Sequence, residues 1–211
     1  MRRTIHADAL PKAYEFVSEH VGSKPNTIDL FCGSGGSVSS WLRERTGEFL
    51  GFDLDQAAID TFRKNHPDAT IKNQDSVEWL RTLEEGSQEC SLIFIDNPLS
   101  IYGENGAYCE HFETLENVHK LVGHSTTLVV NVVPRPYGAT SPENAPWMAR
   151  RCDFYGCDDA SDLACDKLME IYTGKFAANG ISVKASRYIS RAHIDDLDYI
   201  YFYCFHLSRA S

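Results

Sequence analysis

The chain has 211 residues, of which 43% are hydrophobic and 24% are charged. This composition is that of a globular protein, and the length suits one well-buried core, so we expect a single domain over residues 1–211. Lysine and arginine total 20 against 30 aspartates and glutamates, a net charge of −10. Because this charge opposes nonspecific binding to phosphates, a nucleic-acid substrate would need a local basic patch or a partner protein.

The sequence also bears on the compartment. No apolar run approaches the roughly 20 residues that a membrane span needs, and the amino terminus lacks the apolar region of a secretory signal. We therefore expect a cytoplasmic protein with no membrane segment. The seven cysteines are irregularly placed and are predicted to be mostly free thiols. Cys152, Cys157 and Cys165 lack an obvious fourth zinc ligand, so we expect no metal site.

The first predicted elements are a helix and a short strand. Apolar side chains recur at helical spacing over residues 11–21, and Pro25 then interrupts the helix. Residues 28–31 are mostly apolar and contain Asp29. This stretch is predicted to be a buried strand.

A glycine turn follows that strand. Gly33, Gly35 and Gly36 free the backbone to turn sharply and to approach a ligand closely. The next helix is predicted over residues 37–45, with Ser37 as its N-cap. A strand, a glycine turn and a helix in this order form the unit with which a doubly wound sheet opens its cofactor site.

Three cofactor classes use such a turn, and the residues after it separate them. A loop that cradles nucleotide phosphates needs lysine followed by serine or threonine, whereas Ser37 and Val38 follow here. A dinucleotide fingerprint counted from Gly33 needs a small third residue at position 38, and Val38 weakens that reading without excluding it. S-adenosylmethionine, the third class, needs only close backbone approach and an acid near its amino group.

The stretch DLFCGSGG, residues 29–36, resembles the first motif of the class I, Rossmann-like S-adenosylmethionine-dependent methyltransferases, notably those that act on nucleic acids. The resemblance implies that Asp29, Gly33 and Gly35 surround the methionine moiety of this cofactor. Phe31 and Cys32 are expected to line the same site.

The next strand is predicted over residues 48–54, EFLGFDL. Asp53 stands at its carboxyl end, about 20 residues after the glycine turn, which is the spacing of an acid that binds ribose hydroxyls. Leu54 is expected beside the same nucleoside. Asp55 is better explained as the N-cap of a helix over residues 56–65.

A third strand and acid follow at residues 70–76, before a short helix predicted over residues 77–83. In the family that the chain resembles, an aspartate here accepts a hydrogen bond from the adenine amino group, and Asp75 is the matching position. Ser76 is expected beside it. The alternative, that Asp75 or Ser76 only caps the helix, stays open.

The fourth strand leads into the segment with the most informative chemistry. Residues 91–100 read SLIFIDNPLS, and Asp96, Asn97 and Pro98 follow the apolar run directly. This segment resembles the (Asp/Asn)-Pro-Pro-aromatic motif of amino-methyltransferases, which holds an exocyclic amine against the sulfonium methyl. The resemblance implies that these three residues position the acceptor, with Asp96 also near the cofactor. The second proline and the aromatic residue are missing, and Tyr102 is a candidate for the ring.

Two other catalytic schemes would need further residues. An oxygen acceptor would need a general base, for which Glu110 and His111 are candidates, although surface or packing roles are the alternative. A cytosine C5 enzyme would need a cysteine beside the proline, whereas Asn97 and Leu99 flank Pro98 here. Cys109 is close enough in sequence to be a minor candidate.

A helix over residues 113–122 and a fifth strand over residues 126–133 precede a segment rich in proline and glycine, residues 134–160. We predict that this segment is an inserted loop that serves as a substrate lid. The alternatives are a loop packed on the protein's own surface and an interface in a homodimer. Its cations and rings suit the binding of single-stranded or flipped bases: Arg135, Tyr137, Trp147, Arg150, Arg151 and Tyr155.

The remaining elements complete the predicted fold. A helix over residues 160–179 precedes two strands, residues 181–190 and 199–208, that an acidic turn at 193–198 joins into a hairpin. The order predicts an α/β fold with a doubly wound, mostly parallel sheet of seven strands, an antiparallel terminal hairpin and helices on both faces.

The leading hypothesis is a methyltransferase that uses S-adenosyl-L-methionine to methylate an exocyclic amine of a base in DNA or RNA. The first alternative is methylation of a small molecule or a protein side chain, which the acidity and the incomplete motif favour. The second is a cofactor-binding module without catalytic activity.

Overall fold

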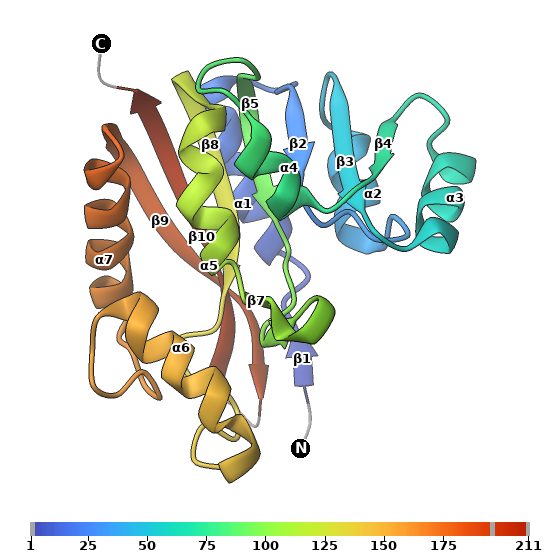
Figure 1. Cartoon of the computed structure of the whole chain (residues 1–211). Helices are drawn as coiled ribbons and strands as arrows, with labels where there is room; N and C mark the ends of the chain where they lie inside the picture. Colours follow the sequence, from blue (N-terminus) through green and yellow to red (C-terminus); the bar gives the residue numbers. More distant parts are fainter. Residues whose placement is uncertain (1–2, 195–196, 210–211) are drawn as a thin grey trace.

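The computed structural model describes residues 3–194 and 197–209. Its centre is a sheet with the strand order β1-β9-β10-β8-β5-β2-β3-β4 (Figure 1). Five of these strands run parallel to one another: β2 Thr27–Asp29, β3 Phe49–Asp53, β4 Thr70–Asn73, β5 Cys90–Ile95 and β8 Val122–Val132. The long strands β9, Ile181–Ile194, and β10, Leu197–Arg209, form an antiparallel hairpin, and β10 also pairs antiparallel with β8.

The predicted doubly wound sheet with an antiparallel terminal hairpin is confirmed. The number of strands differs, because the sheet has eight strands and not seven. The additional strand, β1, covers Arg3–Ile5 and pairs antiparallel with the end of β9. Three residues are too few for a recognisable period, so this strand carried no signal in the sequence.

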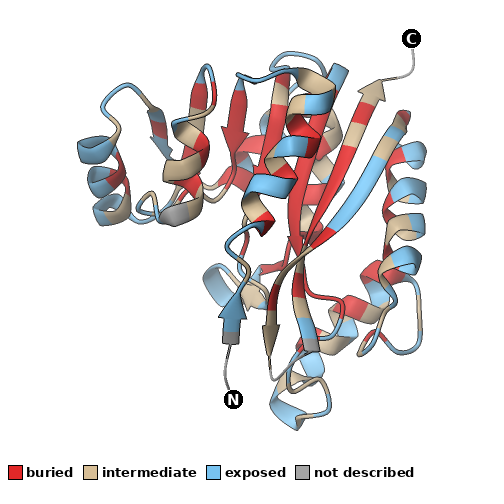
Figure 2. Ribbon diagram, turned by 180° about the vertical axis from the view of Figure 1, so that it is seen from behind, coloured by how far each residue is buried: buried red, intermediate tan, exposed pale blue. Residues whose placement is uncertain are grey.

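Helices cover both faces of the sheet. One face packs against α1, Ala9–Val21, α2, Ser37–Arg43, and α3, Gln56–Asn65. The other packs against α4, Ser76–Thr82, α5, Phe112–Asn117, and α7, Cys165–Ala178. Figure 2 shows buried residues along the central strands and exposed residues on the outer sides of the helices. This double cover explains why β5 is a nearly continuous apolar run and why residues 126–132 of β8 are all buried.

The carboxyl edge of the sheet carries the irregular segments. After β5 comes a small hairpin of β6, Ile101–Tyr102, and β7, Tyr108–Cys109, around the 3-10 turn Glu104–Gly106. Two further 3-10 turns cover Val118–Leu121 and Pro142–Asn144. The segment 134–160 was predicted to be a loop, but it contains helix α6, Ala145–Tyr155. Its buried face includes a charged residue, Arg151, together with Trp147, Phe154 and Tyr155, and this hid the helical period.

The sequence predicted the N-cap residues of two helices, Ser37 for α2 and Asp55 for α3. Asp55 caps α3 as predicted, because its Oδ1 accepts from the backbone N–H of Ala57 at 2.9 Å. At α2 the predicted cap is wrong by one residue, since Gly36 holds the cap position and Ser37 is the first helical residue.

The terminal hairpin is longer than predicted. His193 and Asp198, placed in the turn by the sequence, belong to β9 and β10 and pair with each other. Asp195 and Asp196 of that turn lie outside the described residues. Among the described residues, no helix combines the length and the apolar character that a bilayer crossing requires.

Candidate functional site

A pocket of about 140 Å³ opens at the carboxyl ends of β2, β3 and β4. It gathers five of the residues predicted to bind the cofactor, namely Phe31, Asp53, Leu54, Asp75 and Ser76. The other wall comes from the β6–β7 hairpin. The sequence did not predict that hairpin, because each of its strands has only two residues.

The glycine turn and Asp53 are joined directly. The backbone N–H of Gly33 donates to Asp53 Oδ2 at 2.9 Å, and the N–H of Asp55 donates to Oδ1 at 2.8 Å. These two bonds aim the carboxylate at the pocket while leaving lone pairs free on each oxygen. Gly33 and Gly35 have φ angles of 56° and 71°. These angles lie in the left-handed region, so the turn requires glycine at both positions.

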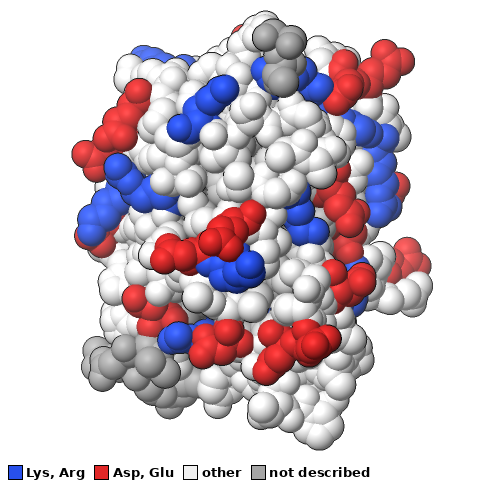
Figure 3. Space-filling model, turned by 90° about the vertical axis from the view of Figure 1, so that its left-hand side faces the viewer, with Lys and Arg blue, Asp and Glu red and all other residues white. Residues whose placement is uncertain are grey.

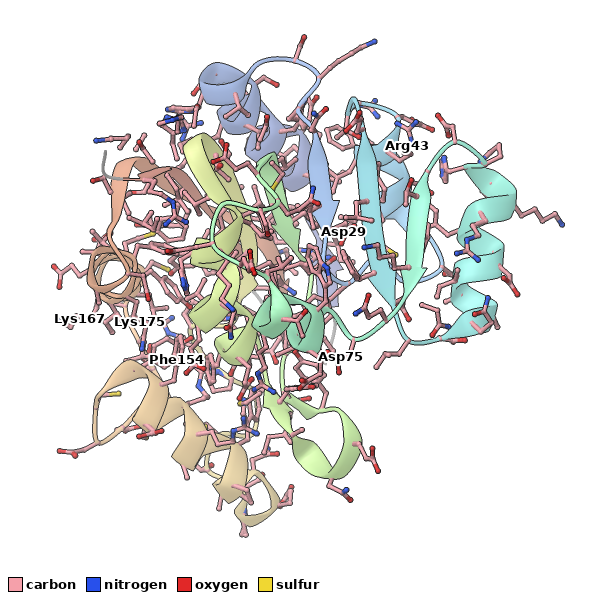
Figure 4. All side chains as sticks on the ribbon, turned by 45° about the horizontal axis from the view of Figure 1, so that its top comes forward. Asp29, Arg43, Asp75, Phe154, Lys167 and Lys175 are labelled. Carbon is pink, nitrogen blue, oxygen red and sulfur yellow. The ribbon has the colours of Figure 1, made fainter. Side chains whose placement is uncertain are left out.

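Asp29 lies beneath this turn, on β2 in the middle of the sheet (Figure 4). Its side chain is fully buried, and Oδ1 accepts from the N–H of Phe31 at 3.1 Å. Oδ2 has no hydrogen-bond partner among the described residues. Burial raises the pKa of this carboxyl to about 7. Asp29 does not line the pocket, and its place near the methionine moiety stays a prediction.

Cys32 does not present its side chain to the pocket. The residue is 2% exposed and packs in the core between the sheet and α2 and α3. A Cβ placed on Gly51 would lie 2.9 Å from Cys32 Sγ, which shows how closely the thiol packs against β3. The Cys32 side chain therefore belongs to the core, and a contact of this residue with the cofactor through its backbone stays a prediction.

Asp75 caps helix α4 and also lines the pocket, and its bond to the adenine amino group stays a prediction. Its Oδ1 caps α4 by accepting from the N–H of Val77 at 2.8 Å and that of Glu78 at 3.1 Å. Its Oδ2 accepts from the Tyr108 hydroxyl at 2.8 Å, on the wall of the pocket (Figure 4). Tyr108 was missed because the sequence separates it from Asp75 by 33 residues.

Tyr102 occupies a different place from the one proposed. It was a candidate for a ring over the methyl acceptor, but it lines the same pocket as Asp53 and Asp75. Its ring centroid lies 5.9 Å from that of Phe31, edge to face. Burial raises the pKa of its hydroxyl above the ordinary value. Tyr102 therefore belongs to the nucleoside side of the site.

The predicted acceptor segment lies at the end of β5, where a cation holds Asp96. Arg191 of β9 forms a two-pronged ion pair with this carboxylate, with Nη2 at 2.8 Å from Oδ2. Asn131 of β8 donates to Oδ1 at 2.9 Å. Asp96 is 20% exposed and Arg191 13%. The sequence did not identify Arg191, which lies 95 residues further along the chain.

Asn97 and Pro98 form a compact exit from the strand. The Asn97 amide donates to the carbonyl of Pro98 at 2.7 Å, and Asn97 is 3% exposed. Its Oδ1 has no hydrogen-bond partner among the described residues. The amide oxygen of Asn97 is therefore a buried acceptor whose bonding capacity is not filled by the described residues.

Glu110 and His111 cannot serve as surface bases, because both are fully buried. Glu110 pairs with Arg151 of α6 and accepts from the Trp147 indole at 2.8 Å. His111 Nε2 lies 2.8 Å from the Tyr172 hydroxyl, and burial lowers its pKa to about 3. The hypothesis of a general base at these positions is wrong. Their contacts instead attach α6 to the segment after β5.

The arginines of the 134–160 segment are engaged within the chain. Arg135 pairs with Asp162, Arg150 with Glu113, and Arg151 with Glu110. Two of the predicted rings, Trp147 and Tyr155, are buried at 7% and 4% exposure, whereas Tyr137 is 62% exposed. The segment packs against its own protein, and the structure assigns most of its cations to internal pairs.

The sheet order and the helices on both faces define the fold, which is the Rossmann-like fold of the class I methyltransferases. No protein-family model and no curated protein sequence matches this chain. Solved structures match it over nearly its whole length.

A Burkholderia thailandensis 1,6-didemethyltoxoflavin-N1-methyltransferase, solved with 1,6-didemethyltoxoflavin and S-adenosylhomocysteine, matches with a TM-score of 0.59 at 11% identity, over 96% of this chain and 79% of that one. The N-methyltransferase NodS from Bradyrhizobium japonicum, solved with S-adenosylhomocysteine, matches with a TM-score of 0.56 at 11% identity, over 93% and 84%. A Clostridium thermocellum protein described as an rRNA methylase gives 0.56 at 11% identity, over 97% and 100%. At these identities the likeness is one of fold.

Proposed function

We propose that this chain is an S-adenosyl-L-methionine-dependent methyltransferase. The observation that carries the proposal is the pocket beside the glycine turn, where the N–H of Gly33 holds the Asp53 carboxylate. Its position supports a nucleoside ligand, because ligands of open α/β sheets bind outside the carboxyl ends of the strands. The solved neighbours that contain S-adenosylhomocysteine support the choice of nucleoside.

The residues present fit this cofactor. Asp53 has free lone pairs for both ribose hydroxyls, and Phe31, Leu54 and Tyr102 supply apolar walls for the adenine. Asp75 is close to saturated by the helix cap and Tyr108, so we assign it one remaining lone pair toward the adenine amino group. The unpaired Oδ2 of Asp29 beneath the turn favours a positive group above it.

At the other end of the site, Asp96, Asn97 and Pro98 would hold the acceptor. When bound, the cofactor supplies an activated methyl group, so the protein contributes mainly position and exclusion of water. Arg191 and Asn131 fix the orientation of Asp96, and Oδ2 keeps one acceptor position for a substrate N–H or O–H. Asp96 would thereby orient the lone pair of the nucleophile.

The class of acceptor is a separate question. The sequence favoured a base amine of DNA or RNA, and the neighbour described as an rRNA methylase supports that hypothesis. The engaged arginines of the 134–160 segment and the net charge of −10 oppose it. On the face shown in Figure 3, basic side chains are interspersed with acidic ones. These observations favour the alternative of a small molecule.

Calorimetry with S-adenosylhomocysteine tests the cofactor assignment. Asp53→Ala should weaken binding, whereas Asp60→Ala, which removes an exposed carboxylate on α3, should not. Transfer of labelled methyl from the cofactor to nucleic acid, protein or metabolite fractions then tests catalysis. Binding without transfer to any fraction would favour the inactive cofactor-binding module, and the absence of binding would refute the proposal.

A further inference from the structure

A second pocket of about 260 Å³ lies where β1 and the start of α1 meet α2 and the terminal hairpin. It shares no lining residue with the first pocket. Its walls are mainly apolar, with Leu10, Val38 and Phe202 on three different elements. His6 and Arg191 are its only side chains able to carry positive charge among the described lining residues.

Arg191 links this pocket to the site of proposed methyl transfer. In the sequence, residues 33–36 of the glycine turn lie between Phe31, which lines the first pocket, and Val38, which lines the second. Arg191 lines the second pocket and also holds Asp96 at the end of β5. A molecule in the second pocket would therefore contact the same arginine that orients the proposed acceptor residue.

The lining restricts the chemistry of an occupant. Arginine has five N–H donors and no acceptor, and Asp96 takes bonds from two of its nitrogens, Nη1 and Nη2. The Arg191 guanidinium also lies 4.7 Å from the centre of the Phe202 ring. An N–H donor group and an aromatic ring therefore lie next to each other in the lining of this pocket. Such a lining suits an apolar, ring-sized molecule with an oxygen acceptor.

We infer that this second pocket binds the methyl acceptor, and that the acceptor is a small molecule with an apolar body and a carbonyl or carboxylate oxygen bound by Arg191. The inference rests on the proposed function. It agrees with the internal pairing of the arginines in the 134–160 segment, which leaves that segment poorly suited to phosphates.

The three tryptophans allow a direct test by NMR. Trp41 lines the second pocket, Trp79 packs on Phe52 of the first at 4.3 Å between ring centres, and Trp147 is buried beside Glu110. The probes are indole-3-carboxylate, indole-3-carboxamide and plain indole, titrated into the full chain. We expect the two oxygen-bearing probes to shift the Trp41 indole N–H signal and to bind roughly tenfold more tightly than indole.

Two variants and a control separate the possibilities. Arg191→Met should reduce both oxygen-bearing probes to the affinity of indole. Val38→Phe should fill the pocket and abolish binding of all three probes, while S-adenosylhomocysteine affinity changes less than about twofold. Tyr188→Ala, on the exposed side of β9, should leave every probe unchanged. Tighter binding of the carboxylate would identify an anionic acceptor, and equal binding a carbonyl.

Several results would overturn the inference. The first is that the probes shift the indole N–H signal of Trp79 in place of that of Trp41. The second is that plain indole binds as tightly as the two oxygen-bearing probes. The third is that Arg191→Met binds the oxygen-bearing probes as tightly as the wild type does. Displacement of a probe by a single-stranded oligoribonucleotide would overturn the small-molecule assignment. An equal loss of cofactor affinity in Val38→Phe would mean that the pocket holds part of the cofactor. Failure of the wild type to bind S-adenosylhomocysteine would refute the proposed function, and with it the acceptor role, even where the probes bind.

Discussion

Replacement of Asp29 by asparagine should make the protein more stable, and by an amount that depends on pH. Burial raises the pKa of Asp29 from 3.8 to about 7, so the folded state holds the proton more tightly than the unfolded state. Ionisation of this carboxyl group therefore lowers the stability of the folded state as the pH rises from 3.8, the pKa in the unfolded state, to about 7, the pKa in the folded state. With about 1.4 kcal/mol per unit, the full cost above this window is about 4 kcal/mol.

Asp29→Asn removes the ionisation and keeps the acceptor for the N–H of Phe31. Between about pH 5 and about pH 8, the stability of the variant relative to the wild type should rise by about 3 kcal/mol. Urea unfolding at the two pH values measures this change. A constant difference between the two proteins would refute the reasoning. Cofactor affinity at the higher pH should fall in the same variant, because the negative charge beneath the turn is lost.

Three further predictions concern the turn and the carboxyl edge. Asp53→Ala should weaken S-adenosylhomocysteine binding by about 1 to 3 kcal/mol in calorimetry, and an unchanged affinity would exclude the ribose role. Glu110→Gln and Arg151→Met should each lower stability by about 3 to 5 kcal/mol in chemical denaturation, since each leaves one partner of a buried pair alone; the double variant should recover much of this loss, and additive losses would contradict the pairing. Gly35→Ala should lower the melting temperature more than Gly33→Ala, because its Cβ would lie 2.8 Å from a phenylalanine ring whereas that of Gly33 meets no atom within 4 Å; equal shifts would contradict this.

The parallel part of the sheet could be predicted from short-range patterns. Asp53 follows an apolar run and precedes a helix capped by Asp55, so a few adjacent residues define the strand end, the turn and the helix start. The helix predicted over residues 56–65 has these bounds in the structure. Because parallel strands place their carboxyl ends at one edge, the neighbourhood of Asp53 and Asp75 followed from strand order alone.

The partners of the site residues could not be predicted in this way. Arg191 and Tyr108 reach Asp96 and Asp75 across 95 and 33 residues, and no local period encodes such a contact. Helix α6 was missed for a related reason, since Arg151 is buried by an ion pair that only the fold brings together. A charged residue in a proline-rich stretch looks solvent-exposed until its partner is known.

The strand order sets constraints on when this protein can complete its sheet. β8 lies between β5 and β10, so during synthesis its outer edge stays open until the last strand in residue order has been made. β1 is the first strand in residue order, and it cannot pair until its partner β9, the second-last strand, has been synthesised. Assembly of the nascent chain therefore requires protection of an apolar strand edge, and slow translation near residues 181–209 should increase its aggregation.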